Sequence, residues 1–141
     1  MRAGAPAAAL AAAILSCGPG ARPPGAPAGP PADGTCGSPF PLEPGASWSG
    51  TTLGRQASMT ARCGAGAAGP EVVHSVVLDA PSRVLVDLST PSHDGALHVR
   101  SGCGNGSIEV ACNEDAGGPG RSLLWAHLDP GTWLVIADGS G

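Results

Sequence analysis

Lysine and tyrosine are both missing from this sequence, and phenylalanine occurs once. All seven basic residues are arginines, which are scattered along the chain, and the formal net charge is −4. Contacts to nucleic-acid phosphates need a clustered positive surface, so this charge distribution argues against a nucleic-acid partner. Apolar runs are short because Gly and Pro interrupt them. None reaches the roughly 20 consecutive residues that a membrane-spanning helix requires.

The first 17 residues have the layout of an export signal. A positive start at Arg2 is followed by an apolar stretch at 7–15, as in segments that direct proteins out of the cytoplasm. The stretch ends in Ile14-Leu15-Ser16-Cys17, which resembles the lipobox of bacterial lipoproteins, where the cysteine receives diacylglycerol. We therefore predict a lipoprotein-type signal segment at 1–17 and a lipid anchor on Cys17. The other interpretation is an ordinary cleaved signal in which Cys17 is incidental.

A linker and four further cysteines follow. Eleven of the seventeen residues at 18–34 are Gly or Pro, so we predict a disordered linker at 18–35 that holds the domain away from the membrane. An exported chain meets an oxidising compartment, where an even set of cysteines is expected to form disulfides. The four cysteines concerned are Cys36, Cys63, Cys103 and Cys112. The predicted location is the cell envelope, with the outer membrane favoured for a lipid anchor, or the secreted fraction.

From residue 36 onward the pattern is all-β. Short apolar runs of period two alternate with Gly, Pro, Asp and Ser, which is typical of a sandwich or barrel of antiparallel strands, and no helix is predicted. The candidate strands are 46–53, 72–78, 83–88, 96–100, 107–112, 123–128 and 132–137. The turns between them carry residues that tolerate tight backbone geometry, such as Asp94-Gly95 and Asn105-Gly106.

Alternation within the strands predicts which side chains face the core. Side chains on one face of 83–88 are apolar and those on the other face include two charges, so the inner face of this strand is clear. The predicted inward positions are Val84, Val86, Leu88, Leu97, Val99, Ile108, Val110, Leu124, Ala126 and Leu128. Both faces of 132–137 are apolar, which predicts a central strand buried on two sides.

Four segments together resemble the bacterial pre-peptidase C-terminal domain. They are Pro70 to Val73, Asp94 to Gly104, Glu109 to Asp115 and Pro130 to Gly139. The resemblance implies an antiparallel, jelly-roll-like β-sandwich of about seven strands at 36–141. It also implies a non-catalytic accessory or binding role beside secreted proteases or on cell surfaces. The family has a further strand after the segment matching Asp138-Gly139, so the final strand is expected to be missing, through truncation or because a partner supplies it.

These observations predict a lipid-anchored envelope protein that displays a binding domain and is not an enzyme. The expected partners are the membrane, through Cys17, and an unidentified protein or polysaccharide. The alternative is the truncated accessory domain of a larger secreted protease or glycosidase. Sequence proximity favours disulfides from Cys36 to Cys63 and from Cys103 to Cys112. The second bond excludes a two-residue hairpin at Asn105-Gly106 and requires a wider loop at 101–107.

No catalytic or metal site is predicted, and no cofactor. Ser92-His93-Asp94 contains the residue types of a hydrolase triad, but three adjacent residues cannot align as a nucleophile, base and carboxylate. The four histidines lack metal-site spacing and are expected to be partly exposed. Asn113-Glu114-Asp115, with Asp87, offers oxygen ligands for calcium without the usual alternating pattern. A sugar platform would need at least two of Trp48, Trp125 and Trp133 exposed together, and core packing is the preferred role for them.

Overall fold

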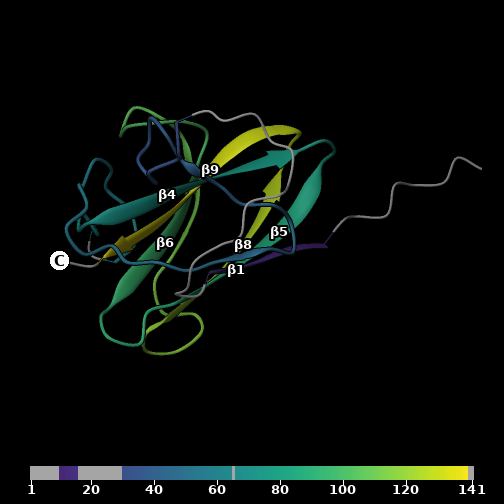
Figure 1. The fold of residues 1–141 in the computed structure, drawn as a ribbon. Coiled ribbons are helices and arrows are strands. Elements are labelled where there is room, and N and C mark those ends of the chain that lie inside the picture. The colour runs from purple at the N-terminus through teal and green to yellow at the C-terminus, as the bar shows by residue number, and fades with distance from the viewer. Residues whose placement is uncertain (1–9, 16–29, 65, 140–141) are drawn as a thin grey trace, which may run out of the picture.

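The computed structural model describes residues 10–15, 30–64 and 66–139, and its strands form an all-β sandwich (Figure 1). No helix occurs among the described residues, as the sequence predicts. The strands are β1 (Leu10–Leu15), β2 (Phe40–Pro41), β3 (Ser47–Trp48), β4 (Glu71–Leu78), β5 (Ser82–Ser89), β6 (Gly95–Arg100), β7 (Glu109–Asn113), β8 (Arg121–Leu128) and β9 (Gly131–Gly139). In this part of the chain there is also no helix capable of crossing a membrane.

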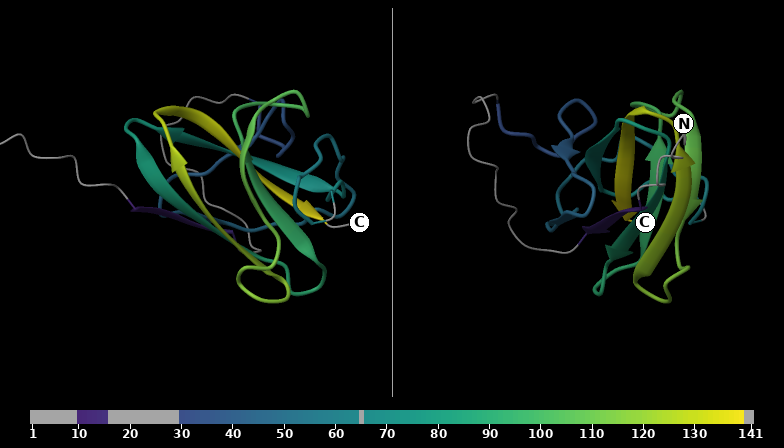
Figure 2. Two further views of the ribbon diagram at one scale, coloured as in Figure 1. Left: turned by 180° about the vertical axis from the view of Figure 1, so that it is seen from behind. Right: turned by 90° about the vertical axis from the view of Figure 1, so that its right-hand side faces the viewer.

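Two sheets face each other in the sandwich. One has the strand order β3-β1-β5-β8 and the other β2-β4-β9-β6-β7, and Figure 2 shows the two layers. The chain passes between the sheets from β4 to β5, from β5 to β6, from β7 to β8 and from β8 to β9. Pairs between the long strands β4 to β9 are antiparallel, whereas β2 pairs parallel to β4 and β1 pairs parallel to both β3 and β5.

The main core lies between the two sheets, where the predicted alternation places it. Val84, Val86 and Leu88 of β5 are buried, while Arg83 is exposed and Asp87 is half-buried. The other core side chains come mainly from β4, β6, β8 and β9, and they include Leu97, Val99, Leu124, Ala126 and Leu128. Burying one such aliphatic side chain contributes about 1.5–3 kcal/mol, so this inner layer supplies most of the hydrophobic stabilisation.

β9 is the central strand of its sheet, and both of its faces are covered. Val135 and Ala137 belong to the core between the sheets. Leu134 and Ile136 pack on the opposite face in a second cluster with Met59 and Val73. The two-sided burial predicted from the apolar run at 132–137 is therefore confirmed.

Residues 30–64 and 66–70, called the covering segment here, are mostly irregular and cover the second face and the edge of β4. The backbone N–H groups of Glu71 and Val73 donate to the carbonyls of Gln56 and Gly34, and that of Leu42 donates to Ser75. These bonds occupy an edge that would otherwise present unpaired backbone groups. Residues before Cys36 thus contact the fold.

Two predicted strand features are wrong. The strand predicted at 46–53 is reduced to β3, because Gly50 packs against the Trp48 ring and the Leu53 N–H then donates to Thr51 Oγ1 at 3.0 Å in a turn. Ile108 and Val110 were expected inside but are 66 % and 43 % exposed. The β6–β7 register places Ala111 rather than Val110 opposite Val99 on the core face, and a β-bulge then leaves Val110 without a ladder partner and sets Glu109 opposite Arg100.

The four cysteines form two disulfides, but the predicted pairing is wrong. Cys36 bonds to Cys103 and Cys63 bonds to Cys112, with Cα–Cα distances of 5.6 and 5.8 Å. The β6–β7 ladder places Cys112 opposite His98, five residues before Cys103. At about 3.3 Å per residue that offset is roughly 16 Å, too far for a disulfide. The expected wide loop does occur between β6 and β7.

The predicted signal segment lies only partly within the described residues. Leu10–Leu15 forms β1, whereas Cys17 and residues 18–29 of the linker lie outside them. Lipidation of Cys17 stays a prediction.

The crossed disulfides give a test of this fold. In a Cys17→Ser background, Cys63→Ala/Cys112→Ala removes one whole bond, so we expect a loss of about 2–4 kcal/mol in the free energy of unfolding and no free thiol. Urea unfolding and thiol titration under denaturing, non-reducing conditions measure both quantities. The matched control Cys36→Ala/Cys63→Ala takes one cysteine from each bond and should expose thiols. Absence of thiols in that control would restore the sequential pairing.

Candidate functional site

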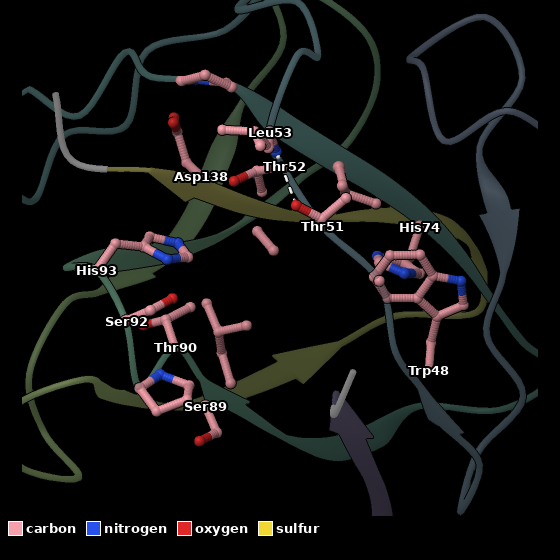
Figure 3. Close-up of a pocket in the computed structure, with 16 residues that line it drawn as sticks. Trp48, Thr51, Thr52, Leu53, His74, Ser89, Thr90, Ser92, His93 and Asp138 are labelled. Atoms are coloured by element: carbon pink, nitrogen blue, oxygen red, sulfur yellow. Dashed lines mark hydrogen bonds between the residues drawn. The ribbon is translucent and has the colours of Figure 1, made fainter. Parts of the chain in front are cut away.

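A cleft of about 700 Å³ opens between the sheets at one end of the sandwich (Figure 3). Its size falls in the range of small-molecule and peptide-side-chain sites. One wall comes from β4 and β9, the opposite wall from the end of β5 and the loop after it, and the segment after β3 closes one side. The lining residues are Trp48, Gly50, Thr51, Thr52, Leu53, Pro70, Val72, His74, Leu88, Ser89, Thr90, Pro91, Ser92, His93, Ala137 and Asp138.

An aromatic group forms one wall of the cleft. The Trp48 ring stacks on Phe40 at a centroid distance of 5.2 Å and meets the edge of His74 at 4.8 Å. His74 projects inward from β4 and packs its ring against both Trp48 and Phe40. The result is a rigid wall of flat rings beside the small side chains of β9.

His74 is a buried, neutral histidine. Its side chain is fully buried, and neither ring nitrogen makes a hydrogen bond of normal geometry with a described residue. Desolvation lowers the pKa of His74 to about 4, and a polar contact with the Val135 backbone opposes this only weakly. Near neutral pH the wall is therefore uncharged, which suits an apolar ligand.

This burial predicts an acid-sensitive stability. Unfolded His74 takes up a proton with a pKa of about 6.5, but the folded state does so only near pH 4, so the free energy of unfolding falls as pH drops through this window. Between pH 6.5 and 4, His74 accounts for a loss of about 3 kcal/mol in the free energy of unfolding. His74→Phe keeps a ring in place and should lose that much less stability between pH 6.5 and 4 in urea titrations. The exposed-histidine control His127→Gln should behave as wild type, and equal pH slopes in all three proteins would contradict the assignment.

A buried polar network lies on the other face of the same sheet. Arg100 Nε donates to His98 Nδ1 at 3.2 Å, and His98 Nε2 lies 3.8 Å from an Asp138 carboxylate oxygen. Arg100 also pairs with Glu109 at 3.2 Å and donates to the Thr60 carbonyl. Glu109 in turn accepts from the Arg62 N–H. These contacts hold the covering segment against β6 and β7.

The triad-like residues are divided between the cleft and an acidic cluster. Ser92 and His93 both line the cleft, yet no hydrogen bond joins their side chains among the contacts of the described residues. Asp94 lies instead beside Glu114 and Asp115. Ser92 and His93 therefore do not form the hydrogen-bonded nucleophile and base of such a triad.

The acidic residues partly match the expected calcium set. One carboxylate oxygen from each of Asp94, Glu114 and Asp115 lies within 4.8 Å of the others, so these three could hold a divalent cation. Asp87 does not belong to this group of carboxylates. Its two oxygens accept hydrogen bonds from Arg121 at 2.9 and 2.6 Å. That pairing lowers the pKa of Asp87. The side chain of Asn113 accepts hydrogen bonds from the backbone of Ala116 and Leu123.

The other residues singled out by sequence are dispersed. His74 and His98 are fully buried, which contradicts the expected partial exposure, whereas His127 is exposed. Trp125 is 45 % exposed on β8 beneath the Arg83 guanidinium, which lies 4.3 Å from its ring centroid. Trp133 is partly buried and packs against the core. Trp48 lies in the cleft wall, so the three tryptophans are in three different places and do not form a shared flat platform.

No protein-family model, curated protein or solved structure matches this chain. The resemblance to pre-peptidase C-terminal domains therefore stays a prediction that the sequence motifs carry. The function of the cleft is therefore inferred below from its geometry alone.

Sequence reasoning missed the cleft itself. Its residues come from β3, β4, β5 and β9 and from loops far apart in sequence, so no local motif brings them together. One feature of the sequence could have indicated it. In Val72-Val73-His74-Ser75-Val76, His74 occupies the same strand face as the apolar residues Val72 and Val76. Such a residue must be buried without charge, and buried titratable groups are enriched at functional sites.

Proposed function

We propose that this chain is a lipid-anchored protein of the bacterial cell envelope whose β-sandwich is a non-catalytic binding module. The observation that carries the proposal is the cleft between the sheets. Its Trp48–His74 wall and the apolar side chains of Val72 and Leu88 suit an apolar group, while hydroxyl-bearing residues line its other side. This combination of apolar walls and a few polar groups is typical of recognition sites.

Two further observations support the envelope setting. The crossed disulfides Cys36–Cys103 and Cys63–Cys112 fit an oxidising compartment. The Ile14-Leu15-Ser16-Cys17 junction supplies the anchor. A binding role is favoured over hydrolysis because, among the contacts of the described residues, no hydrogen bond joins the Ser92 hydroxyl to the His93 ring, the pair that nucleophilic catalysis would need.

Anchoring is tested on Cys17. In a bacterial host that makes lipoproteins, the chain should incorporate labelled fatty acid and partition into the detergent phase, and Cys17→Ser should lose both properties. Cys36→Ser/Cys103→Ser serves as the control, because it removes two other cysteines and should retain the label. Undiminished labelling of the Cys17→Ser protein would refute the anchor.

The cleft is tested with an apolar fluorescent probe, 1-anilinonaphthalene-8-sulfonate. Bound beside Trp48, the dye should receive excitation energy from that tryptophan. Ser92→Trp places a large side chain at the exposed rim and should weaken dye binding at least tenfold. Ala80→Trp, in an exposed turn that does not line the cleft, is the matched control. Equal dye affinity in both variants would mean that the cleft does not accept apolar ligands.

A further inference from the structure

The edge of β5 is occupied by the predicted export signal. β1 pairs parallel with β5 over six residues, from Leu10 opposite Arg83 to Leu15 opposite Leu88. The other side of β5 pairs with β8, so β1 supplies the second neighbour of this strand. On its far side β1 contacts β3 through two residue pairs.

Lipoprotein maturation would remove this neighbour. Signal segments are cut from the mature protein, and a cut before Cys17 takes β1 with it. β5 then becomes a sheet edge with a row of unpaired backbone groups. Such edges bind other strands unless proline, free charges or a covering segment prevents it.

β5 lacks those protections. Its sequence, SRVLVDLS, contains no proline. Its two charged side chains are already engaged by β8, since Arg83 lies over Trp125 and Asp87 pairs with Arg121. The edge of β4, by contrast, is closed by the carbonyls of Gly34 and Gln56 from segments beyond the predicted cleavage point. Among the described strands, β5 and the two-residue β3 are the ones that pair with residues that processing would remove.

We propose that the β5 edge is a strand-acceptor site, filled in the precursor by Leu10–Leu15 and in the mature protein by an extended apolar strand of a partner protein. The strand-acceptor proposal rests on the proposed maturation at Cys17. It specifies that the partner of the binding module is a protein with an extended apolar strand. Strand addition uses backbone hydrogen bonds for affinity and side-chain pockets for specificity. The occupant seen here, LAAAIL, sets the chemistry: six residues, apolar, mostly small and parallel to β5.

The acceptor edge leads into the cleft. Leu15 pairs with both Leu88 and Trp48, and these two residues line the cleft. Figure 3 shows β1 ending beside Trp48 at the cleft. A partner strand that continues past this point would place its next side chains against the aromatic wall. A second mature copy lacks Leu10–Leu15 and cannot donate this strand.

The test uses the full chain with a site-specific protease sequence inserted after Gly20. After cleavage, a fluorescent peptide with the sequence of residues 9–16 should exchange into the site and protect the amides of 83–88 from hydrogen exchange. The matched control peptide carries Ala12→Pro, which keeps the apolar character but blocks strand pairing. We expect at least tenfold weaker binding of the control. Equal binding of the two peptides, no added protection, or dimerisation of the cleaved protein in place of peptide binding would overturn the proposal.

A second variant covers the case in which cleavage unfolds the domain. In the uncut chain, Ala12→Pro should raise hydrogen exchange at 83–88 at least tenfold, while Ala21→Pro in the linker should leave it unchanged. Equal exchange in both variants counts against the acceptor edge. The fatty-acid labelling of Cys17 is read out separately, so loss of label in Cys17→Ser with no peptide binding rejects the acceptor site and leaves the anchor intact.

Discussion

Both faces of β9 are buried, and the covering of its second face organises the rest of the molecule. The described residues form no helix that could cover the outside of this sheet, so the covering segment, residues 30–64 and 66–70, lies over it instead. Irregular chain has many backbone groups to satisfy and little apolar surface to offer. It is therefore held by specific bonds: two disulfides that reach Cys103 and Cys112, and the acceptor carboxylates of Glu71 and Glu109.

The crossed pairing of the cysteines follows from this constraint. Each bond joins the covering segment to β7 or to the loop between β6 and β7, over separations of 67 and 49 residues. Bonds within the segment, or within the hairpin, would tie together residues that are already close in sequence. Long loops restrict the unfolded chain more, so the crossed arrangement stabilises the cover better than the sequential one.

The binding features lie where the sandwich is least complete. At one end the two sheets separate and form the cleft. In the sheet β3-β1-β5-β8, β1 joins β3 to β5 beside this cleft. A neutral, desolvated His74 and the Trp48 ring make one wall of this end apolar, whereas the ion pair of Arg100 and Glu109 is kept on the opposite face of the sheet. Asp138 lies at the border, because it lines the cleft and also approaches His98 at 3.8 Å. The cleft therefore combines an apolar wall with a polar border that includes His93 and Asp138.

The sequence by itself determined the strands from β4 to β9, the inner face of β5 and the central position of β9. These depend on period-two alternation and on turn residues, which are local properties of the chain. Tertiary structure alone decided the disulfide partners, the burial of His74, His98 and Glu109, and the cleft. Each of these depends on the register between separate segments. A single bulge in β7, for example, sets Glu109 opposite Arg100 on the covered face of the sheet. No local pattern records such a register, because it is fixed only when the covering segment and the sheet meet.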